Sequence, residues 1–364
     1  MELVFQRTLN IQRYRIIAEV ARTQKRDELY AVLLLAQERR HVSAKMVADE
    51  LLGNRPETVG KRLIQICVRL QLLVEQEYNY YVLTESGQTA LKKEKIFIPE
   101  RGTWEIWVTD DPLWASALIQ IKPFNETQAR NEIKNQKELK ERCQDMQDIP
   151  NWLVKKLQGQ IITPLADDRN AEYRFDELTE KGELVVTPDA NITATLSIGD
   201  TSDLLFTGKV VNKECRYQEQ HPMTFQSAWH QILQQQNWLT RWRTQQEVLD
   251  VSYQDLSEQE RASFHKDYPI SKPYLTDLDR FDDTTINNVP IAPATQQDAN
   301  HWAYWLLERD TNQYVLKGDF ETMQNKVTEF FPDYKITFPE QRHFAQQLRP
   351  RAYWYLQAPL DWQI

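Results

Sequence analysis

Apolar residues recur at helical spacing between residues 27 and 52, and this pattern predicts two helices. The first is predicted from Asp27, where apolar residues are spaced by three and four positions. These residues are Leu29, Val32, Leu33 and Ala36. Ser43 is a favourable N-cap for a second helix over residues 44–52, and Gly53 is typical of the position after a helix end. The 20 residues at the start alternate only weakly and predict a short hairpin or a strand followed by a helix.

A third helix is predicted from residues 54–57, where Asn54 can cap the helix and Glu57 can close a capping box. Its apolar residues step by four and three positions and predict one buried stripe: Val59, Leu63, Ile66, Leu70 and Leu73. Its polar residues fall largely on the opposite side: Glu57, Thr58, Lys61, Arg62, Gln65 and Arg69. Gly60 is expected on this polar face, where it would let another backbone approach. Such a face carries the groups that contact phosphates and base edges.

Two short strands are predicted within residues 72–83, around a turn at residues 77–79. Thr84 is then a favourable cap for a further helix. The order of helices and hairpin resembles the winged helix-turn-helix superfamily, of the MarR/ArsR-like sort, over about residues 25–95. The resemblance includes the phrase Tyr81-Val-Leu-Thr-Glu-Ser-Gly-Gln-Thr-Ala-Leu91, which is similar to the end of the wing and the start of the next helix in those families.

The resemblance implies that the third helix enters the DNA major groove and that the hairpin, or wing, approaches the minor groove or the backbone. Carried over to this sequence, it implies eight DNA-binding residues: Arg55, Thr58, Lys61, Arg62, Gln65, Arg69, Tyr78 and Asn79. The wing departs from the usual pattern, because Glu75, Gln76 and Glu77 stand where DNA-binding wings often carry Arg or Lys. Winged helices also bind proteins, so a protein-docking scaffold is the alternative.

The remaining sequence predicts an α+β chain of three domains: 1–95, a winged-helix domain with an N-terminal extension; 96–220, β-rich; and 221–364, mixed and mainly helical. Strands are expected at residues 95–99, 103–108, 114–122, 161–163, 171–175, 183–187, 192–198, 204–211, 314–317, 334–338 and 353–357. Helices are expected at residues 125–143, 225–248, 257–266, 298–308, 321–331 and 341–348. Residues 268–294 resemble a surface linker because prolines break their pattern.

Charge is distributed unevenly along the 364 residues. Residues 1–95 carry 16 Lys and Arg against 12 Asp and Glu, whereas the remaining residues carry 28 against 41. A basic start on an acidic body predicts that a polyanion binds at the N-terminal part. The acidic region 96–364 would then provide protein partners, self-association or ligand sensing.

Several other classes of protein are not predicted. No apolar run is long enough to span a membrane, no secretion signal is evident, and three isolated cysteines suit the cytoplasm. Phosphate-binding Gly loops, ligand-spaced His and Cys and a GxSxG motif are missing, so no cofactor, metal or serine catalysis is expected. The acidic segment 277–283 is expected to be a solvated loop rather than a calcium site.

A metal-dependent nuclease with a diverged motif remains an alternative. Asp110 and Asp111 precede the E-x-K triplets at residues 132–134 and 138–140, although these triplets lie in a segment with helical periodicity. The sequence thus favours a double-stranded DNA-binding protein without predicted catalysis. It would be a transcriptional regulator or a DNA-binding accessory subunit of a multi-protein system, such as bacterial antiviral (phage) defence.

Overall fold

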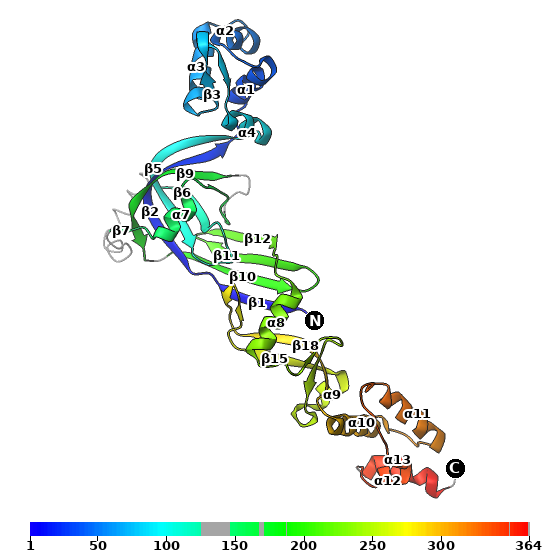
Figure 1. Cartoon of the computed structure of the whole chain (residues 1–364). Helices are drawn as coiled ribbons and strands as arrows, with labels where there is room; N and C mark the ends of the chain where they lie inside the picture. The colour runs from blue at the N-terminus through cyan, green and yellow to red at the C-terminus, as the bar shows by residue number, and fades with distance from the viewer. Residues whose placement is uncertain (125–145, 167–170, 187, 349, 363–364) are drawn as a thin grey trace. The chain divides into compact units, whose positions relative to one another are not determined.

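Helices and strands both form large parts of the chain, so the expected α+β class is confirmed (Figure 1). The structure is a computed structural model that describes residues 1–124, 146–166, 171–186, 188–348 and 350–362. The predicted helix at 125–143 and both E-x-K triplets lie outside the described residues. The chain divides into two compact units. We call Arg7–Ala194 with Leu205–Glu219 the sheet unit, and Met1–Gln6, Thr195–Leu204 and Gln220–Ile364 the carboxy-terminal unit.

A six-stranded sheet forms the centre of the sheet unit, with strand order β6-β5-β2-β9-β7 and β8 paired to β9. The strands are β2 (Ile11–Gln24), β5 (Ile96–Thr109), β6 (Leu118–Pro123), β7 (Gln147–Asp148), β8 (Ile161–Ile162) and β9 (Tyr173–Val185). One face packs into an apolar core with helix α7 (Asn151–Leu157). β2 and β5 are antiparallel along their full length, so the chain leaves the sheet after β2 and re-enters it at β5.

Several strand predictions were wrong in detail. The first residues form two strands, β1 (Leu3–Thr8) and β2, that belong to different sheets, so they are neither the hairpin nor the strand followed by a helix that was expected. The two strands predicted at 171–175 and 183–187 form one strand, β9. The two strands predicted at 95–99 and 103–108 form one strand, because Gly102 stays in register opposite Ala18 instead of ending the strand.

The segment between β2 and β5 is a small helical domain with a hairpin. Its elements are α1 (Asp27–Arg39), α2 (Ala44–Met46), the π-helical turn η1 (Val47–Leu51), α3 (Glu57–Arg69), β3 (Leu73–Glu75), the 3-10 turn η2 (Glu77–Asn79), β4 (Tyr81–Leu83) and α4 (Glu85–Lys93). They enclose a core of their own. Ser43 and Thr84 cap α2 and α4 as predicted, because their side chains accept backbone N–H bonds. The predicted cap at Asn54 was wrong: its φ is 61°, and α3 begins at Glu57 after Pro56 without a side-chain cap.

A second sheet has four strands in the order β1-β10-β11-β12. They are β1, β10 (Ala190–Ile198), β11 (Ser202–Val210) and β12 (Lys213–Gln220). The sequence predicted β10 and β11. It did not predict β12, whose alternation is carried mainly by polar residues, with Cys215 as its one buried position.

The carboxy-terminal unit combines a mixed sheet, in the order β13-β14-β18-β15, with several helices. Its strands are β13 (Trp242–Arg243), β14 (Val248–Val251), β15 (His265–Ile270), β16 (Tyr274–Leu275), β17 (Asp279–Arg280) and β18 (Thr284–Pro293). Its helices are α8 (Phe225–Gln235), the 3-10 turn η3 (Tyr253–Asp255), α9 (Glu258–Ser263), α10 (Gln296–Asp310), α11 (Lys317–Thr328), α12 (Gln341–Ala345) and α13 (Pro350–Asp361).

Several predictions for this unit were wrong. No strand forms at 314–317 or 334–338, because residue 317 already begins α11 and residues 334–338 are irregular, and the helix predicted at 257–266 ends at residue 263 before β15. The supposed linker at 268–294 contains β16, β17, β18 and part of β15, and the helix predicted at 225–248 ends at residue 235. The final segment, predicted as a strand at 353–357, is helical: α13 begins at Pro350 and carries Pro359 in its last turn. Across the described residues, no helix has the length and apolar character needed to cross a membrane.

Candidate nucleic-acid interface

Helix α3 packs into the small domain through a different face from the one predicted. Its buried residues are Gly60, Ile64 and Cys67, spaced by four and three positions. Val59 and Ile66, which were predicted to be buried, are 42% and 37% exposed. The apolar stripe is therefore displaced around the helix, and the prediction was wrong for these residues.

Gly60 explains the displacement. A Cβ atom at this position would lie 2.3 Å from the backbone oxygen of Ala44, which is too close for any side chain. The glycine therefore lets α3 approach the N-terminus of α2 directly, and it belongs to the buried face rather than to the polar face. Cys67 lies on the same buried face, and burial raises the pKa of its thiol to about 12. Cys67 is a buried free cysteine.

The six charged and polar side chains predicted for DNA contact in and before α3 are all exposed: Arg55, Thr58, Lys61, Arg62, Gln65 and Arg69. Four of them are separated by four, three and four residues and so form one row along the helix: Thr58, Arg62, Gln65 and Arg69. Lys61 borders this row on one side. Val59 and Ile66 border it on the other, so the exposed face combines cations with aliphatic groups.

The four cations of this face have no acidic partner among the residues that the structure describes. Within the described ranges, no carboxylate forms an ion pair with Arg55, Lys61, Arg62 or Arg69. Elsewhere in the same small domain, Arg39 pairs with Glu50 at 3.0 Å. Because no described carboxylate neutralises these positive charges of α3, they are available to an anion.

The N-terminus of α3 adds donors to this face. No side chain caps it, so backbone N–H groups of its first turn are not taken up by a cap. Such groups, together with the helix dipole, favour a phosphate oxygen. Arg55 lies just before the helix and adds a positive charge to these donors.

The hairpin tip presents the aromatic side chain of Tyr78. Tyr78 is 85% exposed, and both Tyr78 and Asn79 adopt the left-handed backbone region, with φ of 66° and 59°. A bulky residue seldom adopts this region. The hairpin is anchored to the domain by two 2.8 Å backbone hydrogen bonds between Val42 and Tyr81, so its tip is displayed from a fixed base.

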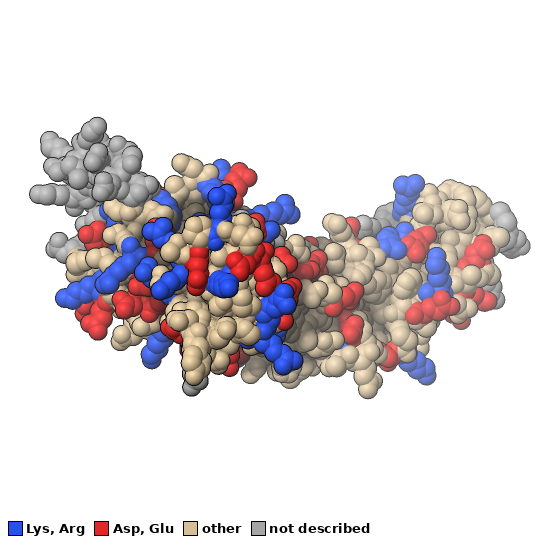
Figure 2. All heavy atoms as spheres, turned by 90° about the horizontal axis from the view of Figure 1, so that it is seen from above, with Lys and Arg blue, Asp and Glu red and all other residues tan. Residues whose placement is uncertain are grey.

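The acidic side chain of Glu75 limits the attraction of the hairpin for phosphate. Glu75 is exposed. The pKa of the Tyr81 hydroxyl is raised first by the burial of Tyr81 itself and second by the negative charge of Glu75. Figure 2 shows, over the face in view, Lys and Arg side chains interspersed with Asp and Glu. The positive character of the candidate interface is therefore local to α3.

A groove of about 660 Å³ lies beside the C-terminal end of α3 within the sheet unit. Its lining includes four cations and three carboxylates: Arg69, Lys93, Lys95, Arg174, Glu19, Glu85 and Asp176. Some of these charges are paired with acidic groups, as in the contact of Lys93 with Glu172 at 3.2 Å. The groove is consequently a weaker anion site than the exposed face of α3.

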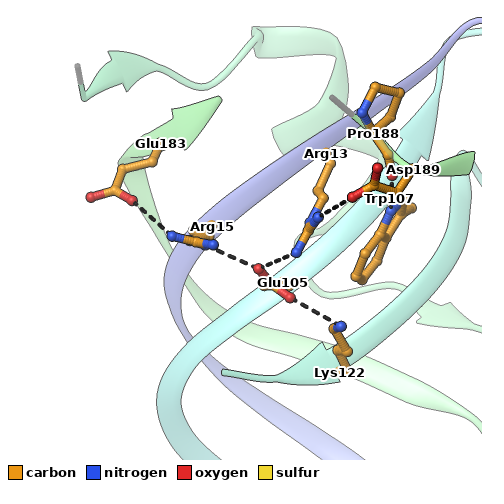
Figure 3. Close-up of polar contacts among 8 residues, drawn as sticks. All are labelled: Arg13, Arg15, Glu105, Trp107, Lys122, Glu183, Pro188 and Asp189. Atoms are coloured by element: carbon orange, nitrogen blue, oxygen red, sulfur yellow. Dashed lines mark hydrogen bonds and ion pairs between the residues drawn. The ribbon is translucent and has the colours of Figure 1, made fainter. Parts of the chain in front are cut away.

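A buried charge cluster occupies the other face of the six-stranded sheet (Figure 3). The carboxylate of Glu105 is 1% exposed and accepts hydrogen bonds from Arg13 at 2.7 Å and Arg15 at 3.0 Å. The ammonium of Lys122 lies 3.3 Å from it. Burial alone would raise the pKa of Glu105, but these cations, Arg13 foremost, hold it below its usual value. Arg13 also pairs with Asp189, and Arg15 with Glu183. The positive and negative charges of the cluster therefore balance, and its role is structural.

One aspartate of the nuclease alternative, Asp111, is held by contacts within the protein. Asp111 forms an ion pair with Arg7 and accepts the backbone N–H of Leu113, which gives it a structural role. In the part of the chain that is described, no three His, Cys, Asp or Glu side chains are grouped to hold a metal ion.

Comparisons with known proteins give no family for the chain. No protein-family model, no curated protein and no solved structure matches it.

Sequence reasoning missed Val59 and Ile66 as members of the exposed face. The available signal was the small residue Gly60, with Ala44 and Ala48 in the preceding helix. Small residues at facing positions let two helices approach closely, and this would have indicated that Gly60 is buried. With Gly60 buried, residues 59 and 66 must turn toward solvent.

Proposed function

We propose that this chain binds double-stranded DNA through a winged helix formed by α1–α4. Helix α3 is the recognition helix, and the β3–β4 hairpin is the wing. The observation that carries this proposal is the exposed face of α3, whose cations have no ion pair with any described residue: Arg55, Lys61, Arg62 and Arg69. Phosphate contacts by such side chains supply most of the affinity of a protein for DNA.

The order of elements supports the same assignment. A helix, a short helix, a longer helix, a two-stranded hairpin and a final helix follow one another in residues 27–93. In winged helices the helix before the hairpin enters the major groove. Here α3 is 13 residues long, and its exposed row of Thr58, Arg62, Gln65 and Arg69 extends over three turns of the helix.

The biological role is a transcriptional regulator or a DNA-binding accessory subunit of a multi-protein system, such as phage defence. In either role the acidic remainder would bind partner proteins or a second copy. Exposed aromatic side chains in the carboxy-terminal unit support this part: Tyr314 lies with its ring centroid 4.9 Å from that of Trp354, and both are partly exposed. The described free cysteines, Cys67 and Cys215, are buried, in keeping with a location in the cytoplasm.

Protein docking through α3 is the second candidate. The exposed Val59 and Ile66 and the acidic Glu75 favour it, because a partner protein could cover the aliphatic side chains. The unpaired cations favour DNA more strongly. A protein partner for this face would have to supply several carboxylates.

Photo-crosslinking of the full-length chain tests the proposal. A benzophenone side chain replaces Gln65 on the exposed row of α3, and in a matched control it replaces the exposed Lys155 of α7. Each protein is irradiated with a labelled 30-base-pair duplex at low salt. We expect covalent adducts from position 65 and few from position 155. Equal yields from both positions, or adducts from position 155 alone, would contradict the assignment of α3.

A further inference from the structure

Two aliphatic side chains lie beside the cationic row of α3. Val59 and Ile66 are seven residues apart and therefore point in nearly the same direction, and Arg62 lies between them, three residues after Val59. Both are substantially exposed although the helix has an alternative, buried face. Isolated exposed aliphatic residues are ordinary, but two on the same stripe of a proposed recognition helix form an apolar surface.

We propose that Val59 and Ile66 recognise thymine by packing against its 5-methyl group in the major groove. This inference rests on the proposed function and specifies its base preference. In the major groove only thymine presents a methyl group, and aliphatic side chains make apolar contact with it. Arg62 would lie between the two contacts, placed to bind a guanine edge or a phosphate.

The charge of the surrounding face identifies the occupant. Arg62 and Arg69 have no carboxylate partner among the described residues, so a polyanion complements the face better than an apolar protein surface does. Duplex RNA is a poor occupant, because uracil lacks the methyl group and the A-form major groove is too narrow for a helix. Duplex DNA that contains thymine offers phosphates to the cationic residues and 5-methyl groups to the aliphatic residues.

The test compares thymine with deoxyuridine in otherwise identical duplexes. The full-length chain is first incubated with a library of random 30-base-pair duplexes, and the bound fraction is sequenced. The most enriched duplex is then synthesised with thymine and with deoxyuridine at every thymine position. We expect the deoxyuridine duplex to bind more weakly by about fourfold for each methyl group contacted, which corresponds to ~0.8 kcal/mol for one buried carbon.

Variants separate the methyl contacts from the electrostatic contacts. Val59→Ala with Ile66→Ala should bind the two duplexes equally, while Lys61→Ala should weaken both and keep their ratio. Ala has the higher helix propensity, so the double variant should fold. Ile17→Ala removes an aliphatic side chain exposed to a similar extent on β2 and should leave the ratio unchanged.

Each failure points to a different conclusion. If DNA is bound but no sequence is enriched, or if deoxyuridine has no effect, thymine recognition is wrong and DNA binding stands. If the double variant still distinguishes the two duplexes, other residues contact the methyl groups and the inference is overturned. If no duplex is bound at any salt concentration, the proposed function itself is wrong, and the aliphatic face is assigned to a protein partner.

Discussion

Glu105 shows how a single carboxylate can organise one face of a sheet. It lies opposite Arg15 on β2 and opposite Lys122 on β6 in the strand register, so backbone pairing already places the charges together. Trp107, two residues further along β5, lies between Arg13 and Lys122 with both cations within 5 Å of its ring (Figure 3). Removing the carboxylate would leave buried cations without their main partner.

We therefore expect Glu105→Gln to destabilise the protein by about 3–5 kcal/mol near pH 7, the usual cost of breaking a buried ion pair. Because the folded-state pKa of Glu105 is lowered, its contribution is present above the unfolded-state pKa and is lost as pH falls through the folded-state value. Denaturant unfolding of both proteins between pH 7 and pH 3 measures this difference, which should shrink toward acid pH.

Glu183→Gln is the matched control, because Glu183 is partly exposed and lies 3.9 Å from Arg15. A pair of this kind contributes at most about 1 kcal/mol. Equal stability of the Glu105 variant and the wild type would show that the cluster contributes nothing to the fold.

At the scale of elements, the sequence predicted the existence of α3 but not its orientation. Apolar residues at three- and four-residue spacing occur in two adjacent stripes, one through Val59 and Ile66 and one through Ile64 and Cys67. Hydrophobicity alone favours the first stripe because Gly60, in the second, contributes no apolar side chain. The contact with Ala44 decides between them, and that contact is tertiary.

Paired substitutions test this orientation. Ile64→Ala removes a side chain that is 1% exposed and should destabilise the protein by about 2–5 kcal/mol. Ile66→Ala changes an exposed side chain and should alter stability by no more than about 0.5 kcal/mol. Thermal melts of the two variants measure the difference. The reverse order would restore the stripe predicted from the sequence.

Gly60→Ala tests the close approach of α2 and α3. In an exposed helix interior this change would stabilise by up to about 1 kcal/mol. Here the added Cβ meets the backbone oxygen of Ala44, so we expect destabilisation of about 1–3 kcal/mol, as for other overpacked sites. Denaturant unfolding checks the sign, and a more stable variant would contradict the described packing. Gly318→Ala, in α11 with open space around it, is the control expected to be stabilised or unchanged.

The carboxy-terminal elements show a second limit of local pattern. Residues 353–357 are rich in aromatic groups and predict a strand, yet they belong to α13, where Leu356 and Gln357 are buried. Likewise, prolines in β15 and β18 suggested a linker. Pro293 ends β18, and the register of the β15–β18 pair shifts between Lys266 and Tyr268, so the sheet accommodates the irregular positions.

At the scale of the whole molecule, the distribution of charge favours the N-terminal part of the chain over the remainder as a site for DNA. The N-terminal 95 residues have an excess of basic residues, and the rest of the chain has an excess of acidic residues. The sequence was enough to predict this charge imbalance. It was also enough to predict the eight candidate contact residues, which lie on or just before the exposed face of α3 and at the hairpin tip. Val59 and Ile66 were not available, because their exposure depends on packing within the small domain.

The domain organisation also bears on how the protein should be tested. β2 and β5 pair along fourteen positions on either side of α1–α4. A fragment that ends at residue 95 would leave β2 without this partner. Its failure to bind DNA could then arise from unfolding, so variants of the full-length chain are the appropriate material.

The most direct test of DNA recognition by α3 is the salt dependence of duplex binding by Lys61→Ala with Arg62→Ala. Both side chains are exposed and unpaired among the described residues, so the variant should fold normally in thermal melts. Lys155→Ala with Lys209→Ala, at exposed sites outside α3, is the control. Fluorescence anisotropy titrations of a 30-base-pair duplex at several salt concentrations give the slope of log K against log salt.

If both α3 side chains contact phosphates, we predict that the slope decreases in magnitude by about two units and that affinity falls at low salt, whereas the control keeps both values. An unchanged affinity and slope in a folded Lys61/Arg62 variant would contradict the account and would assign the exposed face of α3 to protein contacts.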